Sequence, residues 1–431
     1  MRNNNTRESV TSSNLGHFPK DWNSFYLDEL GNTNSPTIKA GPFGSSLTKS
    51  TYVAFGYKVY GQEQVIRNDE LWGDYFVSDD KFKELKTCEV LPGDILLSLV
   101  GTAGKLLVIS TLAPKGIINP RLLRFRFAPD KLNSQFFKYL FESDIIQNYL
   151  SSNAQGGTMA VLNAGMLKTL EITIPRIAEQ TAIANALSDV DALIVELEKL
   201  IAKKQAIKTA TMQQLLTGRT RLPEFANHPD GTPKGYKQTE LGEIPDDWEV
   251  IRLGEASTFI NGRAYALHEW ESSGTPVIRL QNLTGRGDGY YFSNLTLPDK
   301  QYCEKGDLLF MWSATFGPVI WQGEKAIYHY HIWKIESAKK FSKIFLFHLL
   351  DDMTEKLKRG SSSGGTMLHV TKEKMESTKA VFPTFEEQAA IANILSDMDE
   401  EIQSLQQRLD KTSKIKQGMM QELLTGKTRL V

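Results

Sequence analysis

The sequence has very little cysteine, little net charge and no long apolar runs. Its 431 residues include only two cysteines, Cys88 and Cys303. Neither lies in a Cys-x-x-Cys pair, which argues against thiolate zinc sites and against a disulfide framework, so we expect both to be buried small residues. No run approaches the roughly 18–20 apolar residues that span a bilayer, so no membrane role is expected. The polar opening segment, residues 1–14, lacks the apolar stretch of a signal peptide, and the cytoplasm is the expected compartment.

The chain is nearly neutral, with a formal net charge of −1. Proteins bind phosphate backbones through basic surfaces, so a net charge near zero argues against a protein that binds nucleic acid without a partner. Either the basic residues gather on one face, or partner chains supply part of the grip. The hydrophobic content of 41% is that of an ordinary globular protein with packed cores.

Signatures of catalysis are also missing. No Pro-Pro occurs, so the Asn/Asp-Pro-Pro-aromatic element with which adenine methyltransferases hold a flipped base is absent. The segment 101–105 has the wrong spacing for a phosphate loop, and Glu84-Leu-Lys86 resembles a nuclease triplet only superficially. His329 and His331 have a spacing that metal ligands use on a strand, but no third ligand is evident. We therefore expect no catalytic residues, no bound cofactor and no metal.

What the chain does contain is an internal repeat. Residues 175–222 align with residues 383–430 without a gap at an offset of 208, and 25 of the 48 positions are identical. The repeat extends upstream, because Gly93-Asp94 matches Gly306-Asp307 at an offset of 213 and residues 15–22 match residues 241–248 at an offset of 226. The whole chain is thus a duplication in which the second copy is shorter.

The repeat predicts the domain organisation. We expect a globular module at 1–174, a helix at 175–222, a linker at 223–240, a second module at 241–382 and a second helix at 383–431. The linker carries three prolines and two glycines within residues 223–235, which cannot continue a helix.

The two helical segments carry an apolar stripe with a spacing of 4, 3, 4, 3, 4, which is a heptad seam. The seam residues are Ile183, Leu187, Val190, Ile194, Leu197 and Ile201 in the first copy, and Ile391, Leu395, Met398, Ile402, Leu405 and Leu409 in the second. A core helix inside each module would explain a stripe, but strict repetition after two divergent modules favours pairing of the helices with each other. An antiparallel pair would give a pseudo-twofold arrangement, and two similar readers a fixed distance apart suit two half-sites on a DNA duplex.

The modules themselves predict an α+β fold with a twisted sheet. Short β-type runs occur at 57–60, 94–100 and 122–127 in the first module and at 275–280, 307–312 and 332–335 in the second, with helices near 134–149 and 342–358.

Polar residues and glycines of the kinds that read base edges or hold phosphates gather at the turns of both modules. The candidates are Lys39, Gly41, Phe43, Gly44, Ser45, Ser46, Lys49, Asn119, Arg121, Gly156, Gly157 and Thr158 in the first module, and Asn261, Arg263, Arg279, Gln281, Asn282, Thr315, His329, His331, Gly364, Gly365 and Thr366 in the second. Any one of these could be an ordinary solvated loop residue, but as a group they indicate a binding surface.

These features resemble the specificity subunits (S subunits) of type I restriction–modification enzymes over nearly the whole chain. The most specific marks are the duplicated Glu-Gln-x-Ala-Ile-Ala-Asn-x-Leu-Ser-Asp-x-Asp at 179–191 and 387–399, and the Leu-Leu-Thr-Gly-(Arg/Lys)-Thr-Arg-Leu ends. Lesser marks are Gly41-Pro-Phe-Gly-Ser45 and Gly93-Asp94. The second module has Asn261-Gly-Arg263 in place of Gly-Pro-Phe-Gly, so its base preference should differ.

The resemblance implies two target recognition domains that each read one half of an asymmetric bipartite site in double-stranded DNA. It implies that the paired helices set the unspecified gap and dock two methyltransferase subunits, which two restriction–translocase subunits join in the full complex. S-adenosylmethionine, ATP and Mg²⁺ would then be bound by those partners, which would also share the phosphate contacts.

Two other readings of the residues stay open at this point. The chain could be an autonomous DNA-modifying enzyme that flips a base, or an interaction scaffold with two modules on a coiled coil and no nucleic acid.

Overall fold

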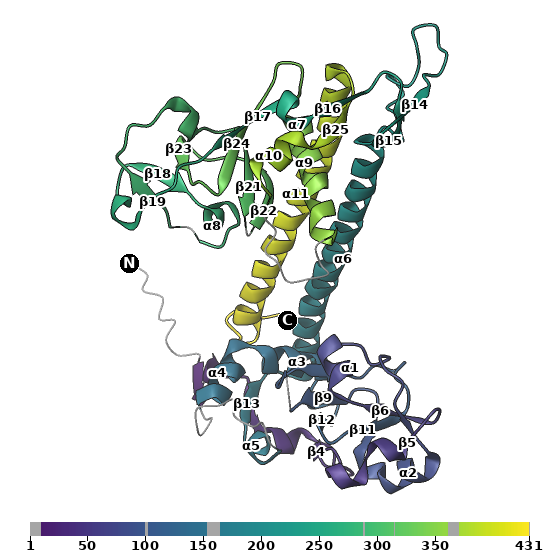
Figure 1. Ribbon diagram of the computed structural model, residues 1–431. Helices are drawn as coiled ribbons and strands as arrows, with labels where there is room; N and C mark the ends of the chain where they lie inside the picture. Colours follow the sequence, from purple (N-terminus) through teal and green to yellow (C-terminus); the bar gives the residue numbers. More distant parts are fainter. Residues whose placement is uncertain are drawn as a thin grey trace. The chain divides into compact units, whose positions relative to one another are not determined.

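The computed structural model describes residues 10–99, 102–152, 164–287, 289–313, 315–360 and 370–430 (Figure 1). The chain divides into two compact units. Unit 1 comprises Met1–Glu198 together with Arg408–Val431, and unit 2 comprises Lys199–Gln407. Each unit therefore contains one globular module and a part of each long helix.

Two sheets form the globular part of unit 1. The first is antiparallel, in the order β10 (Leu106–Val108), β9 (Ile95–Ser98), β12 (Leu122–Phe125) and β4 (Ile38–Ala40). The second is mixed, in the order β5 (Tyr52–Val53), β7 (Phe76–Val77), β6 (Tyr57–Tyr60), β11 (Gly116–Ile118) and β8 (Glu89–Val90), and β6 runs parallel to β11. Two antiparallel pairs join β1 (Val10–Ser13) to β2 (Gly16–Pro19) and β3 (Asn23–Tyr26) to β13 (Glu171–Ile174).

Helices close one face of the first sheet in unit 1. The helices of this module are α1 (Gln62–Arg67), α2 (Asp79–Glu84), α3 (Ser134–Glu142), α4 (Asp144–Ser152) and α5 (Ala164–Lys168). Phe125 of β12 packs on Phe137 and Phe141 of α3, with ring centroids 5.3 and 6.3 Å apart. The single helix expected near 134–149 is two helices, because the backbone at Ser143 is extended.

Unit 2 repeats this design, with longer strands in its antiparallel sheet and four strands instead of five in its mixed sheet. Its antiparallel sheet has the order β17 (Ser257–Asn261), β24 (Ile332–Ser337), β21 (Leu308–Ser313) and β22 (Thr315–Ile320). Its mixed sheet has the order β19 (Tyr291–Ser293), β18 (Thr275–Ile278), β23 (Ala326–Tyr328) and β20 (Tyr302–Cys303), with β18 parallel to β23. The remaining strands pair β16 (Glu249–Arg252) with β25 (Lys379–Phe382) and β14 (Tyr236–Thr239) with β15 (Gly242–Pro245). The helices are α7 (Leu253–Ala256), α8 (Leu280–Leu283), α9 (Lys343–Gly360) and α10 (Lys372–Ser377). Strand β14 lies within the segment expected to be a linker.

The two long helices, α6 (Ile177–Leu215) and α11 (Phe385–Leu423), have 39 residues each, or about 58 Å at 1.5 Å per residue. They pack against each other and run antiparallel (Figure 1). In unit 1, Lys416 contacts Asp191 at 2.5 Å. In unit 2, Lys208 contacts Asp399 at 2.6 Å, and Lys204 pairs with Glu401. The expected antiparallel pairing is confirmed.

The seam residues lie at different depths along the helices. The buried ones are Ile183, Leu187, Leu197, Ile201, Ile391 and Leu395, and the half-buried ones are Val190, Ile194, Met398, Ile402, Leu405 and Leu409. Ile183 and Leu187 belong to the core of unit 1, together with Leu423 and Leu424. Near the helix ends, the stripe therefore faces the module as well as the other helix.

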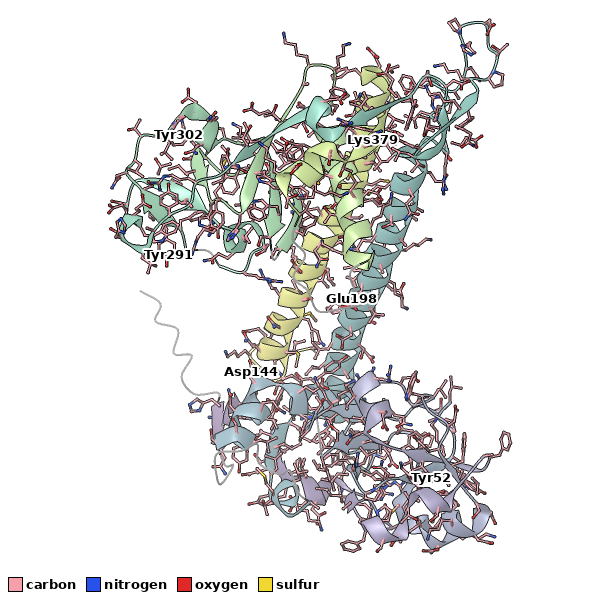
Figure 2. The ribbon with its side chains drawn as sticks, viewed as in Figure 1. Tyr52, Asp144, Glu198, Tyr291, Tyr302 and Lys379 are labelled. Carbon is pink, nitrogen blue, oxygen red and sulfur yellow. The ribbon has the colours of Figure 1, made fainter. Side chains whose placement is uncertain are left out.

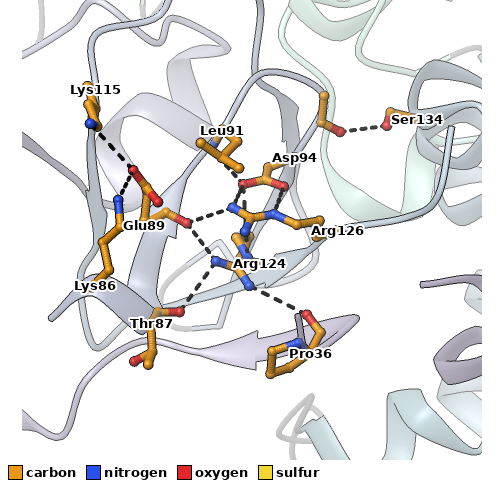
Figure 3. A network of polar contacts seen from close by, with 11 residues as sticks. Pro36, Lys86, Thr87, Glu89, Leu91, Asp94, Lys115, Arg124, Arg126 and Ser134 are labelled. Atoms are coloured by element: carbon orange, nitrogen blue, oxygen red, sulfur yellow. Dashed lines mark hydrogen bonds and ion pairs between the residues drawn. The ribbon is translucent and has the colours of Figure 1, made fainter. Parts of the chain in front are cut away.

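The repeated Gly-Asp turns have a structural role. Gly93 has φ = 85°, and the Asp94 carboxylate accepts hydrogen bonds from the Leu91 N–H at 2.7 Å and from Arg126 at 2.8 and 2.7 Å (Figure 3). The neighbouring Arg124 is 1% exposed and donates to the Glu89 carbonyl at 2.6 Å (Figure 3). In unit 2, Asp307 accepts from the Glu304 N–H at 2.9 Å in the same way.

Both cysteines are buried and free, as expected, and burial raises the pKa of the Cys303 thiol to about 12. Among the helices that the structure describes, none is long and apolar enough to cross a membrane.

Candidate functional site

In unit 1, three segments meet where the parallel strands β6 and β11 end. The Asn119 N–H, just after β11, donates to the Tyr60 carbonyl at the end of β6 at 2.9 Å. The Gly41 N–H donates to the Leu122 carbonyl at 3.0 Å, which brings in the turn that follows β4. Because parallel strands end at the same edge of a sheet, the turns that follow them form one surface. We call this the strand-end site of unit 1.

Gly41 is required by a close approach of two backbones. A Cβ at this position would lie 1.9 Å from the Asn119 carbonyl oxygen, so no side chain fits unless the turn moves. The glycine in the Gly-Pro-Phe-Gly turn therefore allows this turn to lie directly against the Asn119 backbone.

A pocket of about 720 Å³ opens at the strand-end site of unit 1. Three of the candidates from the sequence, Lys49, Asn119 and Arg121, line it. The pocket lining also contains four residues that the sequence did not predict: Tyr52 (labelled in Figure 2), Tyr75, Gln62 and Glu63. The Gln62 Oε1 atom is buried and has no hydrogen-bond partner in the described part of the chain, so its capacity to accept a hydrogen bond is unused.

The other candidates in unit 1 do not belong to the described lining of this pocket. Lys39 is half-buried on β4, whereas Phe43 is 89% exposed. A short 3₁₀ turn directly follows Phe43 and comprises Gly44, Ser45 and Ser46. Gly156, Gly157 and Thr158 lie outside the described residues.

Unit 2 contains the same backbone arrangement with different side chains. The His329 N–H donates to the Ile278 carbonyl at 2.9 Å, and the Gly262 N–H donates to the Ile332 carbonyl at 3.1 Å. Gly262 thus corresponds to Gly41, and a Cβ there would lie 2.3 Å from the His329 carbonyl oxygen. His329 therefore corresponds to Asn119 of unit 1, because each donates its N–H to the last residue of the neighbouring parallel strand. Arg279 corresponds to Gly61, because each directly follows that last residue.

Aromatic rings dominate the strand-end site of unit 2. The Trp270 ring lies 4.7 Å from both Tyr265 and Tyr291, centroid to centroid; Figure 2 labels Tyr291. The His329 ring lies 5.2 Å from that of His331. Burial lowers the pKa of His329 to about 4, and the charges of His331 and Arg279 add to this effect. His329 is therefore neutral at pH 7 and can both donate and accept a hydrogen bond.

Several candidates in unit 2 are occupied by contacts within the protein. Arg263 forms an ion pair with Glu269 and lies over the Tyr265 ring. The Asn282 side chain accepts from the Arg279 N–H at 2.9 Å and donates to the carbonyls of Gly287 and Gly289, so it holds its own loop.

The remaining candidates differ in exposure. Asn261 and Gln281 are exposed, and Thr315 is half-buried on β22. Gly364, Gly365 and Thr366 lie outside the described residues. Among the residues that the structure describes, no group of His, Cys, Asp and Glu side chains could hold a metal ion.

Comparison with known proteins identifies relatives over most of the chain. A family model described as type I restriction modification DNA specificity domain matches residues 19–209 and 245–413. The type I restriction enzyme MjaVIII specificity subunit of Methanocaldococcus jannaschii is 29% identical over 81% of this chain and 83% of its own length. The MjaIX specificity subunit of the same organism is 21% identical over 97% of this chain and 96% of its own. The crystal structure of the type I restriction–modification S subunit from M. genitalium shares the fold, with a TM-score of 0.55, 18% identity and 98% coverage of both chains.

Proposed function

The chain belongs to the type I restriction–modification DNA specificity family, and on that premise we propose that each unit reads one half of an asymmetric, two-part DNA site. The protein is a non-catalytic DNA specificity subunit of a type I restriction–modification system. The observation that carries the proposal is the pair of strand-end sites. They share one backbone arrangement but present Gly61 and Asn119 in unit 1, and Arg279 and His329 in unit 2.

The strand-end sites hold the residue types that read DNA directly. Asn and Gln amides suit adenine, Arg suits guanine, and exposed Lys and Arg suit phosphates. We assign base reading in unit 1 to Gln62 and to the side-chain NH₂ group of Asn119, whose Oδ1 atom accepts from the Arg121 N–H at 2.9 Å. Lys49 and Arg121 are assigned to the phosphates. The other candidates in the turns, including those outside the described residues, are proposed as supporting contacts.

The long helices would set the unspecified gap between the half-sites. Each unit contains parts of both helices, and under this proposal the helix length would set the distance between the two DNA-reading modules. We further propose that the helices dock two methyltransferase subunits, since this is the most repetitive part of the sequence and suits a partner present in two copies.

The chain is part of a type I restriction–modification complex. We propose that two restriction–translocase subunits complete it in the cytoplasm, and that S-adenosylmethionine, ATP and Mg²⁺ bind to those partners. Methyltransferase subunits that contact the duplex would supply positive charge, which reconciles DNA binding with the net charge of −1.

A module exchange tests the assignment. Residues 241–382 would be replaced by the corresponding module of another specificity subunit, and the methylated motif would be read by sequencing DNA modified by the complete methyltransferase complex. We expect one half of the motif to change and the other to stay. A motif that changes in both halves, or in neither, would contradict one reader per unit.

A second experiment tests the spacer. Four residues inserted after Glu198 in α6 and after Gln407 in α11 leave the contacts within each unit intact, because both points lie at unit boundaries. The added length of about 6 Å should widen the unspecified gap by one to two base pairs, with both half-sites unchanged. An unchanged gap would refute the role as a spacer.

The interaction-scaffold alternative makes a different prediction. A specificity subunit should bind duplex DNA with an affinity that falls steeply as salt rises, most clearly together with its methyltransferase partner. A scaffold without a nucleic-acid role should show no such salt dependence.

A further inference from the structure

Arg279 occupies the position in unit 2 that Gly61 holds in unit 1. Both residues directly follow a strand that runs parallel to its neighbour, and both have a backbone N–H capped by a side-chain oxygen three residues later, Asn282 in unit 2 and Gln64 in unit 1. The two units thus differ at this position of the strand-end site by the presence or absence of one guanidinium group.

The Arg279 guanidinium is held by stacking. It lies 4.1 Å from the centre of the Tyr291 ring and 5.9 Å from that of Trp270. Within the described residues it has no ion pair or hydrogen bond, and its Nε atom is buried without a partner. The charge of Arg263, by contrast, is paired with that of Glu269, although its Nη1 atom is also buried without a partner. Stacking fixes the plane of a guanidinium and lowers the entropy lost on binding, while its N–H edge stays free for a ligand.

Two groups on DNA accept a planar pair of hydrogen bonds from arginine: the O6 and N7 edge of guanine, and a phosphate. The surroundings favour guanine. The group is half-buried among aromatic rings beside His329, which is uncharged at pH 7. The other guanidinium described at this site, that of Arg263, is paired, so the site offers one uncompensated cation and little of the charge that phosphates attract.

We propose that Arg279 is a specificity-determining residue that reads one guanine in the half-site of unit 2. This inference rests on the proposed function, in which unit 2 reads one half of the DNA site. Gly61 leaves the corresponding position in unit 1 without a guanidinium, so unit 1 should not select guanine through that position.

The test uses the complete methyltransferase complex carrying Arg279→Gln or Arg279→Lys, with the methylated motif read by sequencing. Loss of a bidentate Arg–guanine contact should reduce discrimination at one base pair by roughly 5- to 150-fold, all within one half-site. Arg279→Lys should also relax that position, because lysine keeps the charge but lacks the planar fork. Arg252→Gln, which removes an exposed arginine from β16 in the same unit, is the matched control and should leave the motif unchanged.

The outcomes separate the possibilities. One relaxed guanine position in one half-site supports the proposal. Weaker methylation of every site with an unchanged motif identifies a phosphate contact and overturns it. If Arg279→Gln fails to fold, Arg279→Lys decides by the same criterion. Exchange of residues 241–382 is run in parallel: if the exchange changes a half-site and the Arg279 variants do not, this inference fails while the proposed function stands.

Discussion

Replacing Arg221 with alanine should destabilise the protein much more than replacing Arg429, although the two residues are equivalent in the repeat. Arg221 donates to Glu387 twice at 2.7 Å and to Asp247 at 2.9 and 3.2 Å. Arg429 repeats this clamp in unit 1, where it donates to Glu179 at 2.6 and 2.7 Å and to Asp21 at 2.9 and 2.8 Å. The geometry is the same, so any difference must come from the surroundings.

The difference lies in burial. The side chains of Arg221 and Glu387 are 6% and 1% exposed, whereas those of Arg429 and Glu179 are 33% and 10% exposed. The Arg221→Ala change would leave the Glu387 carboxylate buried with one remaining donor, the Trp248 indole at 3.0 Å. Breaking a buried pair in this way costs about 3–5 kcal/mol. Water can reach the groups around Arg429, so its loss should cost only about 1–2 kcal/mol.

Urea-induced unfolding of the full chain, followed by circular dichroism, measures both values. Arg221→Ala combined with Glu387→Gln should recover part of the loss, because the buried charge is then removed. The exposed Arg252→Ala serves as the control, with an expected change within about 0.5 kcal/mol. Equal losses for the two clamp arginines, or a larger loss for Arg429→Ala, would refute the argument from burial.

Acid and steric variants provide further tests. Burial lowers the pKa of both His329 and His348 to about 4. Between about pH 6.5 and 4 the unfolded chain therefore binds protons that the folded chain does not. The free energy of unfolding of unit 2 should fall by up to about 3 kcal/mol per histidine as the pH is lowered across that range. His348 contacts Ser396 and Asp399, as Tyr139 of unit 1 contacts the equivalent Ser188 and Asp191. His348→Tyr should therefore reduce this loss in a pH series of thermal unfolding curves; an unchanged pH dependence would count against it. Gly41→Ala should displace Asn119 and relax the half-site read by unit 1 while leaving the other half unchanged, as the methylated motif would show. An unaltered motif would mean that this turn does not position the reader.

Much of the fold followed from patterns that are local in the sequence. The heptad spacing and the ungapped repeat at 208 residues predicted two paired helices, and the β-type runs at 57–60 and 275–280 are the strands β6 and β18. The break at Ser143 escaped prediction, because the apolar residues on both sides continue a helical period and only the extended backbone at that residue interrupts it.

The candidate site was harder to predict, because its members come from segments that are far apart. Asn119 and Arg121 were predicted as polar residues in a turn. Gln62 lies at the start of a helix, and only the parallel pairing of β6 with β11 brings it into the same pocket as Asn119. Nothing in the sequence distinguishes Tyr291 from other strand residues, and its contact with Arg279 is visible only in the fold. Conversely, Asn282 was a reasonable candidate by residue type, yet its amide is used by its own loop.

The division of the chain has a consequence for the order of folding during synthesis. Unit 2 is a continuous stretch, Lys199–Gln407, whereas unit 1 needs Arg408–Val431 to complete it. Leu423 and Leu424 belong to the core that contains Ile183 and Leu187, and these leucines leave the ribosome after all of unit 2. The module that is synthesised first is therefore the last to complete its core. A ribosome that stalls before residue 408 would release a chain in which unit 2 is complete and the apolar core of unit 1 is exposed.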